Sequence, residues 1–518
     1  MKKYWMMAAL GMALMLTAPA WAIQADFSGE YRVSGIYNDH LTLIDDDSSS
    51  DAFMEMRLRL RADFTITDNL SLTTRLDGLD KRWGDTDESK VTSRSTQNLG
   101  TPSTTYPLIS TITTVEDDQD NIDLEWVYMT VKTGLGGFLV GRQRGNVWGL
   151  NFAETEDPRD RVVYVLPIKN TIIAAVYEKS REFDGENTTT SDADIDRYYL
   201  TVTQKGENFK AGLLYGLYNF KTFQDMWQSQ QSQLLTNFSA INGSSLGPTP
   251  DFLLSDVTAN VFIPYFDGKF GPFGVKAELS WAFGDINYDS PYRVTPTNAQ
   301  VNAATIPFGI ENADGDDSKD GDVMSYLLEL SYDVGPFTFQ AGYAHYSGDA
   351  DYNDDEVGAF GYIERGEDWE KLAILTGTHH GLETSLGNGL GNLAGGGKAT
   401  LDGYNMFYAG VDFAVLDNLT VGLLYGKSTA DDTTEEDPNR SIAYAQYNAA
   451  FGASFSNADW DDDHGQEVDL TVTWQIFPNL KYQFIAAYLD AGDYWKQGDD
   501  SVDLKDNYLL WHRLTVEF

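Results

Sequence analysis

Residues 468–488 read Val468-Asp-Leu-Thr-Val-Thr-Trp-Gln-Ile476, then Phe477-Pro478-Asn479, then Leu480-Lys-Tyr-Gln-Phe-Ile-Ala-Ala-Tyr488. Apolar and polar side chains alternate on both sides of the short segment that contains proline and asparagine. An alternation with a period of two predicts a β-strand with one apolar and one polar face. Two such strands joined by three residues predict an antiparallel hairpin.

The same pattern recurs along most of the chain. The segments predicted as strands are 26–37, 53–66, 70–83, 121–133, 138–148, 161–167, 171–180, 194–205, 209–220, 252–265, 272–285, 322–333, 337–348, 403–415, 419–428, 465–476, 480–492 and 506–518. A soluble β-sandwich would also contain strands of this kind. Here, however, short connections alternate throughout with long ones, which span 38–52, 84–120, 149–160, 181–193, 221–251, 286–321, 349–402, 429–464 and 493–505.

This alternation decides the predicted fold class. A membrane barrel with both termini on one side has an even number of strands, tight turns at one end and long loops at the other. It must also close, because an open sheet edge in lipid leaves backbone groups unpaired. We predict an all-β fold: a single transmembrane antiparallel up-and-down β-barrel of 18 strands, with short periplasmic turns and long extracellular loops.

Proline placement tests the strand boundaries, since proline cannot donate a hydrogen bond to the ladder. The prolines predicted to flank short turns are Pro264, Pro272, Pro336 and Pro478. Pro167 is predicted to lie in a turn between the strands 161–167 and 171–180. If that region is one strand, parity fails and sixteen strands become the better count.

The N-terminus carries an export signal. Lys2 and Lys3 precede an apolar run, and the segment ends in Ala20-Trp21-Ala22. This order predicts a signal peptide over residues 1–22, followed by the barrel over residues 23–518. A membrane anchor helix is the alternative, but the apolar run is short for a span. We therefore expect Sec export through the periplasm to the outer membrane of a Gram-negative cell.

Composition excludes several functions. The chain has no Cys, so disulfides, thiolate metal sites, covalently attached haem and a Cys nucleophile are excluded. It has 79 acidic against 36 basic residues and a formal net charge of −43, so nucleic acid is not an expected partner. No stretch after the signal is long and apolar enough for a membrane helix.

The last strand carries a candidate assembly signal. Its residues that share one face are Tyr508, Leu510, Leu514, Val516 and Phe518. A terminal Phe that closes alternating apolar positions resembles the C-terminal signal of outer-membrane proteins. That resemblance implies recognition by the barrel-assembly machinery. His512 departs from the apolar pattern.

The polar faces predict a charged lumen. If Met54, Met56 and Leu58 face lipid, the arginines between and after them point inward. The residues predicted to line the pore are Arg32, Arg57, Arg59, Arg61, Arg75, Asp77, Arg142, Arg144, Lys276, Glu278, Asp469, Lys481 and Arg513. A basic wall that faces acids would order permeating ions and select their charge. Alternatively, these charges pair with one another and only stiffen the wall, and both interpretations stay open.

Residues 139–149 read Leu139-Val-Gly-Arg-Gln-Arg-Gly-Asn-Val-Trp-Gly149. With the barrel plan, this stretch resembles porins of the alginate-export type and related 18-stranded substrate-selective porins. The resemblance implies passage of carboxylated sugars or other small anions past lumen arginines, with Arg142 and Arg144 at the matching positions. The strongly acidic loops are a departure from that family.

The long loops contain acidic runs at 45–47, 116–118, 314–322, 349–356, 431–437 and 459–463. None has the spacing of an EF-hand loop. We expect no cofactor, while Ca²⁺ on these extracellular loops, also as a bridge to lipopolysaccharide phosphates, stays open. His379 and His380 are adjacent and therefore form a poor metal site. Loops 349–402 and 84–120 are both long enough to constrict the pore.

The sequence thus predicts an outer-membrane channel for passive diffusion of small hydrophilic solutes or ions. A preference for small anions, and a monomer or a homotrimer, are left open. The first alternative is a barrel that sheathes or binds a partner protein. The second is a barrel enzyme, which we do not expect, because no catalytic signature surrounds the histidines.

Overall fold

The computed structural model describes residues 23–40, 43, 50–84, 122–145, 147–150, 152, 156–181, 195–221, 254–288, 318–348, 356–358, 369–377, 402–432, 461–496 and 501–518. The predicted signal peptide, His379, His380 and most of the acidic loop runs lie outside these residues. In the described ranges, no helix is both long and apolar enough to cross a membrane.

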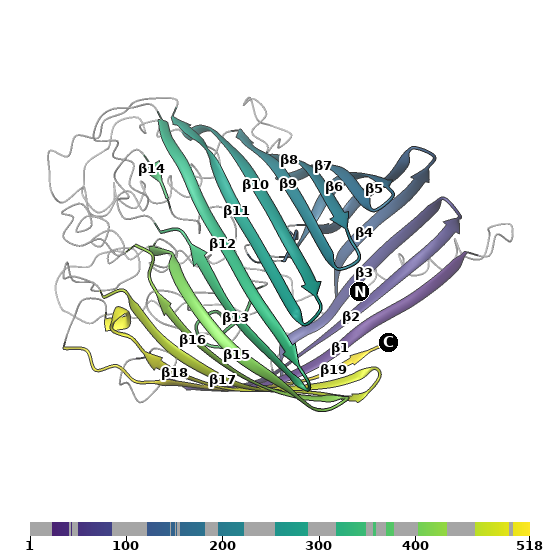
Figure 1. Ribbon diagram of the computed structural model, residues 1–518. Coiled ribbons are helices and arrows are strands. Elements are labelled where there is room, and N and C mark those ends of the chain that lie inside the picture. The colour runs from purple at the N-terminus through teal and green to yellow at the C-terminus, as the bar shows by residue number, and fades with distance from the viewer. Residues whose placement is uncertain are drawn as a thin grey trace, which may run out of the picture.

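The strands of the chain form one sheet (Figure 1). They are β1 (Gln24–Asp39), β2 (Asp51–Thr67), β3 (Leu70–Arg82), β4 (Ile122–Thr133), β5 (Gly136–Gly145), β6 (Asp157–Ile168), β7 (Thr171–Arg181), β8 (Ile195–Lys205), β9 (Phe209–Lys221), β10 (Leu254–Phe270), β11 (Phe273–Tyr288), β12 (Ser318–Val334), β13 (Phe337–Tyr346), β14 (Glu356–Val357), β15 (Tyr404–Leu416), β16 (Leu419–Thr429), β17 (Asp463–Phe477), β18 (Leu480–Ala491) and β19 (Asn507–Glu517). A 3₁₀ turn, η3 (Asp493–Lys496), follows β18.

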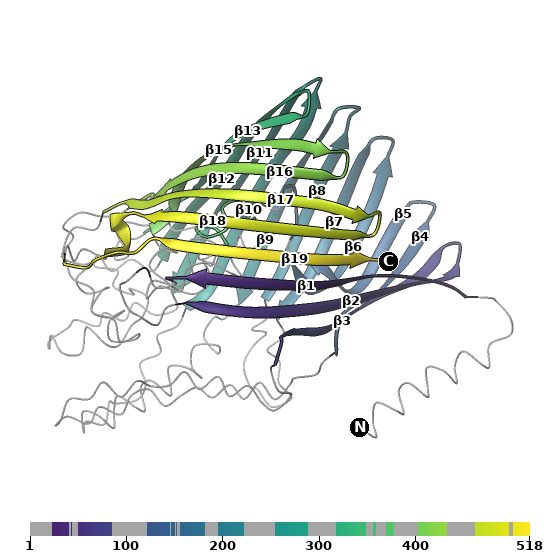
Figure 2. The ribbon, with the colours of Figure 1, turned by 90° about the horizontal axis from the view of Figure 1, so that it is seen from below.

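Eighteen of these strands make a closed antiparallel up-and-down barrel. β14 is a two-residue addition that runs parallel to β12, and each other strand pairs with its neighbours in chain order. β19 returns to pair with β1, which closes the sheet. Figure 2 shows the C-terminus at the end of the barrel that carries the tight hairpins. The predicted fold class, strand number and alternation of short and long connections are confirmed.

The seam between β1 and β19 is sealed at the turn end by the last residue. The Gly29 N–H donates to the Phe518 carbonyl at 2.7 Å, and the Phe518 N–H donates to the Gly29 carbonyl at 3.0 Å. The Phe518 ring lies over Gly29, where an added Cβ would be 2.6 Å from a ring carbon. Glycine is therefore required where the ring covers the seam.

The outer face is apolar, as lipid requires. At the turn end it carries a girdle of exposed or half-exposed aromatic side chains, which include Phe138, Tyr164, Phe209, Phe273, Tyr332, Phe337 and Phe413. Aromatic girdles of this kind mark the membrane interface of outer-membrane barrels. Alternation places the polar residues of each strand on the inner face.

A second feature of the outer face recurs below the long loops. In each long-loop hairpin from β7 to β19, a tyrosine hydroxyl or a tryptophan indole N–H on the first strand forms a hydrogen bond. Its partner is a polar side chain on the second strand or just before it. These hydrogen bonds are Tyr177–Asp196 (3.0 Å), Tyr215–Asn260 (2.7 Å), Trp281–Asp322 (2.6 Å), Tyr343–Asn405 (2.5 Å), Tyr425–Gln466 (2.9 Å) and Tyr488–Asp506 (2.8 Å). We call this set the hairpin ties.

Two predictions about proline are wrong. Pro167 lies in β6, opposite Ile172, and the turn is the pair Lys169-Asn170, in which Lys169 has a φ of 54°. Proline is tolerated there because only one residue separates it from the strand end. The count of eighteen does not change, since β6 and β7 remain separate strands.

Pro264 does not flank a turn, because β10 continues to Phe270 and turns at Gly271-Pro272. The ladder between β10 and β11 pairs Phe262 with Trp281 and Tyr265 with Glu278, and it skips Ile263 and Pro264. The Ile263 carbonyl instead accepts a hydrogen bond from the Trp148 indole at 2.9 Å. A side chain from a loop thus satisfies backbone that the proline leaves outside the ladder.

Candidate functional site on the inner wall

Strand register brings the arginines of β1, β2 and β3 onto the inner face. Arg32 lies opposite Arg57. On the next pair of strands, Arg59 lies opposite Asp77 and Arg61 opposite Arg75. The inner face of this wall therefore carries a band of charge, as the alternation along residues 53–66 predicts.

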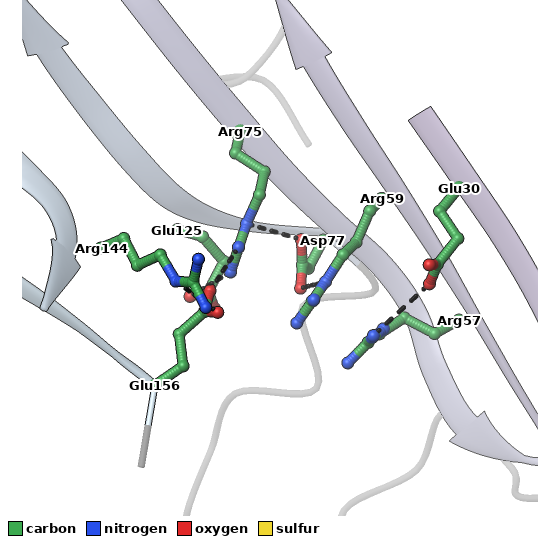
Figure 3. A network of polar contacts seen from close by, with 8 residues as sticks. All are labelled: Glu30, Arg57, Arg59, Arg75, Asp77, Glu125, Arg144 and Glu156. Carbon is green, nitrogen blue, oxygen red and sulfur yellow. Dashed lines mark hydrogen bonds and ion pairs between the residues drawn. The ribbon is translucent and has the colours of Figure 1, made fainter. Parts of the chain in front are cut away.

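Arg75 is the centre of a network of ion pairs (Figure 3). Its side chain is only 8% exposed. Its guanidinium contacts Asp77 at 3.2 Å, Glu125 at 3.4 Å and Glu156 at 3.0 Å. Asp77 also accepts a hydrogen bond from Arg59 at 2.7 Å. Buried charges are stable only when they are paired in this way.

Glu156, just before β6, extends the network to the next strands. Its second oxygen lies 2.7 Å from Arg144 Nε. The Arg144 carbonyl accepts a hydrogen bond from Arg161 at 2.9 Å. A loop carboxylate therefore joins the charges of β3 to those of β5 and β6.

A second basic cluster surrounds Glu178 on β7, which is fully buried. Arg161 lies 3.0 Å from its carboxylate, and Arg197 and Arg159 lie 3.9 and 4.0 Å away. Arg197 also stacks over the Tyr218 ring at 4.6 Å. Three guanidinium groups thus share one carboxylate. This cluster was not predicted, although the alternating Arg159 and Arg161 are a signal for it.

Arg32, Arg57 and Arg513 form the least neutralised part of the wall, and we call them the arginine triad. Among the described residues, the ion pair that Arg57 forms is a long one with Glu30, at 3.5 Å. Arg513 donates to Ser34 at 3.0 Å and lies 3.9 Å from Glu55. The positive charges of the triad repel one another. A passing anion would relieve this repulsion.

The structure corrects the prediction for Arg142. Register places Arg142 on the outer face, on the side of Phe138 and Val140, and it turns Gln143 inward. The Arg142 side chain is 49% exposed and pairs with Asp160 at 3.3 Å. Arginine is tolerated there because this end of β5 lies beyond the aromatic girdle, toward the long loops. Arg144 reaches the inner network through Glu156.

The remaining predicted pore residues lie on the inner face of other strands. Lys276 pairs with Glu329 at 3.3 Å. Lys481 lies on β18 opposite Thr515, which is buried on the inner face. Glu278 and Asp469 are 3% and 2% exposed, because loop segments cover them.

The first of these segments is 147–152, in the loop between β5 and β6. Glu278 accepts the main-chain N–H groups of Leu150 at 2.5 Å and Phe152 at 3.3 Å. The Phe152 carbonyl accepts the Tyr346 hydroxyl at 2.6 Å. The segment therefore spans the inner faces of β10, β11 and β13. This inward loop was not predicted.

The second segment is 369–377, within the long connection between β13 and β15. Ala373 N–H donates to Asp469 at 3.0 Å. The next two N–H groups, of Ile374 and Leu375, donate to Glu467 at 2.7 and 2.8 Å. Loop 349–402 was one of two loops predicted as long enough to constrict the pore, and this part of it lies against the inner wall. Most of the other, 84–120, lies outside the described residues.

The two segments meet along one half of the inner wall. The rings of Phe152 and Trp369 pack edge to face at 5.0 Å. Together the segments contact inner-face residues of strands between β9 and β17. The arginines lie on the other half, on strands β19 and β1 to β8.

Nothing in the described ranges supports an enzyme site. Ser428 lies 3.0 Å from His464 Nδ1, but both residues are 0% exposed, so a substrate could not reach them. The described residues also contain no group of three or more His, Asp or Glu that could hold a metal ion.

Comparison with known proteins agrees with this architecture. A family model described as Gram-negative porin matches residues 8–363. The chain belongs to the Gram-negative porin family. This porin is an outer-membrane channel for small solutes, which its closed barrel and polar inner face accommodate. No curated protein matches the sequence.

Solved structures match the chain at low sequence identity and low TM-score. One is OmpT, an outer membrane protein of Vibrio cholerae in a trimer form, with 13% identity, coverage of 96% of this chain and 100% of that chain, and a TM-score of 0.37. Another is OccK8 (OprE) of Pseudomonas aeruginosa, with 13% identity, coverage of 96% and 98%, and a TM-score of 0.45. A third, OccD3 (OpdP) of the same organism, has 10% identity, coverage of 97% and 93%, and a TM-score of 0.44.

The Arg75 network makes a prediction about stability. We expect Arg75→Met to lower the free energy of unfolding by about 3 kcal/mol, because it removes a buried guanidinium that three carboxylates share. Arg61→Met is the control, since the Arg61–Asp63 pair is 42% and 36% exposed and should contribute less than about 1 kcal/mol. Urea unfolding followed by tryptophan fluorescence measures both. Equal losses would show that burial of the network does not matter.

Proposed function

We propose that this porin admits small hydrophilic solutes by passive diffusion and favours small anions. The observation that carries the preference is the unequal covering of the inner wall. Glu278, Glu467 and Asp469 lie under loop segments, while neither of the two described inward segments lies over the half of the wall that holds the arginine triad.

Two factors weaken the interaction of a solute with the carboxylates on the acidic half of the wall: their distance from the solute and the loop segments that cover them. Coulomb interaction falls with separation and with the water between two charges. A solute in the open half meets the guanidinium groups first, and it meets the covered carboxylates only across the inward segments. Charged side chains around the bore then favour solutes of the opposite sign.

Recording of the purified porin in a planar bilayer tests the proposal. We expect stepwise conductance and, in a tenfold KCl gradient, a reversal potential on the chloride side of zero, inside the limit of about 59 mV for one charge. High salt should be used as well, because it screens the acidic loops. A potential on the potassium side under both conditions would contradict the anion preference. A barrel that gave no current in any salt would contradict the channel.

The finer expectations about partners and ions are part of the same proposal. We propose contacts with outer-membrane lipid and lipopolysaccharide, and folding by the barrel-assembly machinery. We propose no resident cofactor, with Ca²⁺ limited to the acidic extracellular loops. Both a monomer and a homotrimer are compatible with a pore within each chain. A sheath or an enzyme is less well supported, because two loop segments lie inside the barrel and the Ser428–His464 pair is buried.

A further inference from the structure

Segment 369–377 is held by two carboxylates that have no basic partner. Among the described residues, Glu467 and Asp469 form no ion pair, and both are buried on the inner face of β17. The two side chains share a hydrogen bond with each other, and they accept three more from consecutive main-chain N–H groups, those of Ala373, Ile374 and Leu375. These carboxylates therefore hold the segment against the wall, and the segment supplies hydrogen bonds that the buried carboxylates need.

The wall is also shaped to receive the segment. Gly426 on β16 faces the Leu372 side chain, and a Cβ at position 426 would lie 2.5 Å from a Leu372 methyl carbon. Thr376 closes the segment on itself, since its hydroxyl donates to the Leu372 carbonyl at 2.9 Å. At the other end, Lys371 donates to Glu329 at 2.6 Å and to Gln340 at 2.8 Å.

The segment carries one exposed acid toward the arginines. Glu370 is exposed, and its charge acts on the Arg513 guanidinium of the arginine triad, although the segment is anchored on the opposite half. The segment therefore narrows the lumen and also places a negative charge near the basic wall.

We propose that Glu467 and Asp469 are positioning residues that set the bore and the charge preference of the channel by holding segment 369–377 inward. This inference rests on the proposed function as a channel. Release of the segment from β17 widens the pore and withdraws Glu370 from Arg513. Conductance and anion preference then rise together.

Glu467→Gln is the first test. Each oxygen of Glu467 accepts one N–H, from Ile374 and Leu375. A glutamine side chain has one acceptor oxygen, so its amide group would point a donor at the second N–H. We expect single-channel conductance to rise at least about 1.5-fold as the constriction opens. The reversal potential should move further to the chloride side.

Three further variants distinguish the effect of the position of segment 369–377 from the effect of the charge on Glu370. Gly426→Phe fills the seat of Leu372 without a change in charge and should reproduce both effects. Glu370→Gln should shift the reversal potential toward chloride and leave conductance unchanged. Asp412→Asn is the matched control, since Asp412 is a half-buried acid on the inner face of β15 and accepts no main-chain N–H from the segment. It should change conductance little.

The outcomes are distinguishable. Folding of each variant is checked by the shift that heating produces on an SDS gel. If a wall variant does not fold, replacement of residues 370–376 by glycine and serine tests the same point without a change in the barrel. Wild-type conductance in the glycine and serine variant or in folded Glu467→Gln would overturn the inference while leaving the channel intact. Absence of current in the wild type would instead contradict the proposed function.

Discussion

Deletion of Phe518 is expected to lower the amount of protein that folds into the barrel. The residue contributes two backbone hydrogen bonds with Gly29 across the seam, each stabilising by about 1 kcal/mol. Its ring also covers Gly29. Because β19 is the strand that closes the sheet, these losses fall at the point where an open edge would otherwise face lipid. The ratio of folded to unfolded protein should fall by roughly tenfold.

The measurement is the amount of heat-modifiable protein in the outer-membrane fraction. Phe477→Ala is the matched control: Phe477 is 60% exposed at the turn end of β17, away from the seam, and its loss should leave most of the protein folded. Refolding of the purified Phe518 deletion in detergent separates two causes. Normal refolding there, with failure in cells, would point to recognition by the assembly machinery. Normal folding in both settings would contradict the predicted role.

Replacement of the arginine triad by glutamine is expected to reverse the charge preference. Arg32, Arg57 and Arg513 repel one another, and their loss removes three positive charges while the nearby carboxylates, which include Asp80, keep theirs. Glu30 and Glu55 remain on the same wall. In a tenfold KCl gradient, the reversal potential should cross zero to the potassium side, by a substantial part of the limit of about 59 mV.

Two controls limit the interpretation of that result. Arg142→Gln removes one positive charge from the outer face and should not move the reversal potential. Arg59→Gln leaves Asp77 paired with Arg75 and should produce a smaller shift than the triad. A triad variant that kept the wild-type reversal potential would mean that the arginines only stiffen the wall.

The barrel was predictable from the sequence because its determinants are local. Alternation assigns each strand, and the lengths of the connections assign parity, so eighteen strands follow without any knowledge of contacts. The inward position of Arg57, Arg59 and Arg61 follows from the methionines and leucines between them. The wrong prediction for Pro167 affected only the position of one turn and not the number of strands.

The parts that were not predictable depend on register or on distant contacts. Arg142 and Arg144 flank Gln143, and charge alone cannot decide which of these alternating residues faces inward. Pairing with β4 and β6 decides it. Arg159 fell outside the predicted strand because β6 starts at Asp157. The inward segments bind through main-chain N–H groups, which leave no mark in the sequence, and Pro264 is accommodated by Trp148 from another loop.

The hairpin ties have a consequence for how this surface can change. Each tie joins the two strands of a hairpin below its long loop, so strand register does not depend on what the loop contains. The entropic cost of a longer loop grows only slowly with its length. Foreign peptides grafted into these connections, for example between β9 and β10, should be displayed on the cell surface while the barrel beneath stays in register. The same independence lets the exterior change without a change in permeation, as long as the inward segments 147–152 and 369–377 are kept.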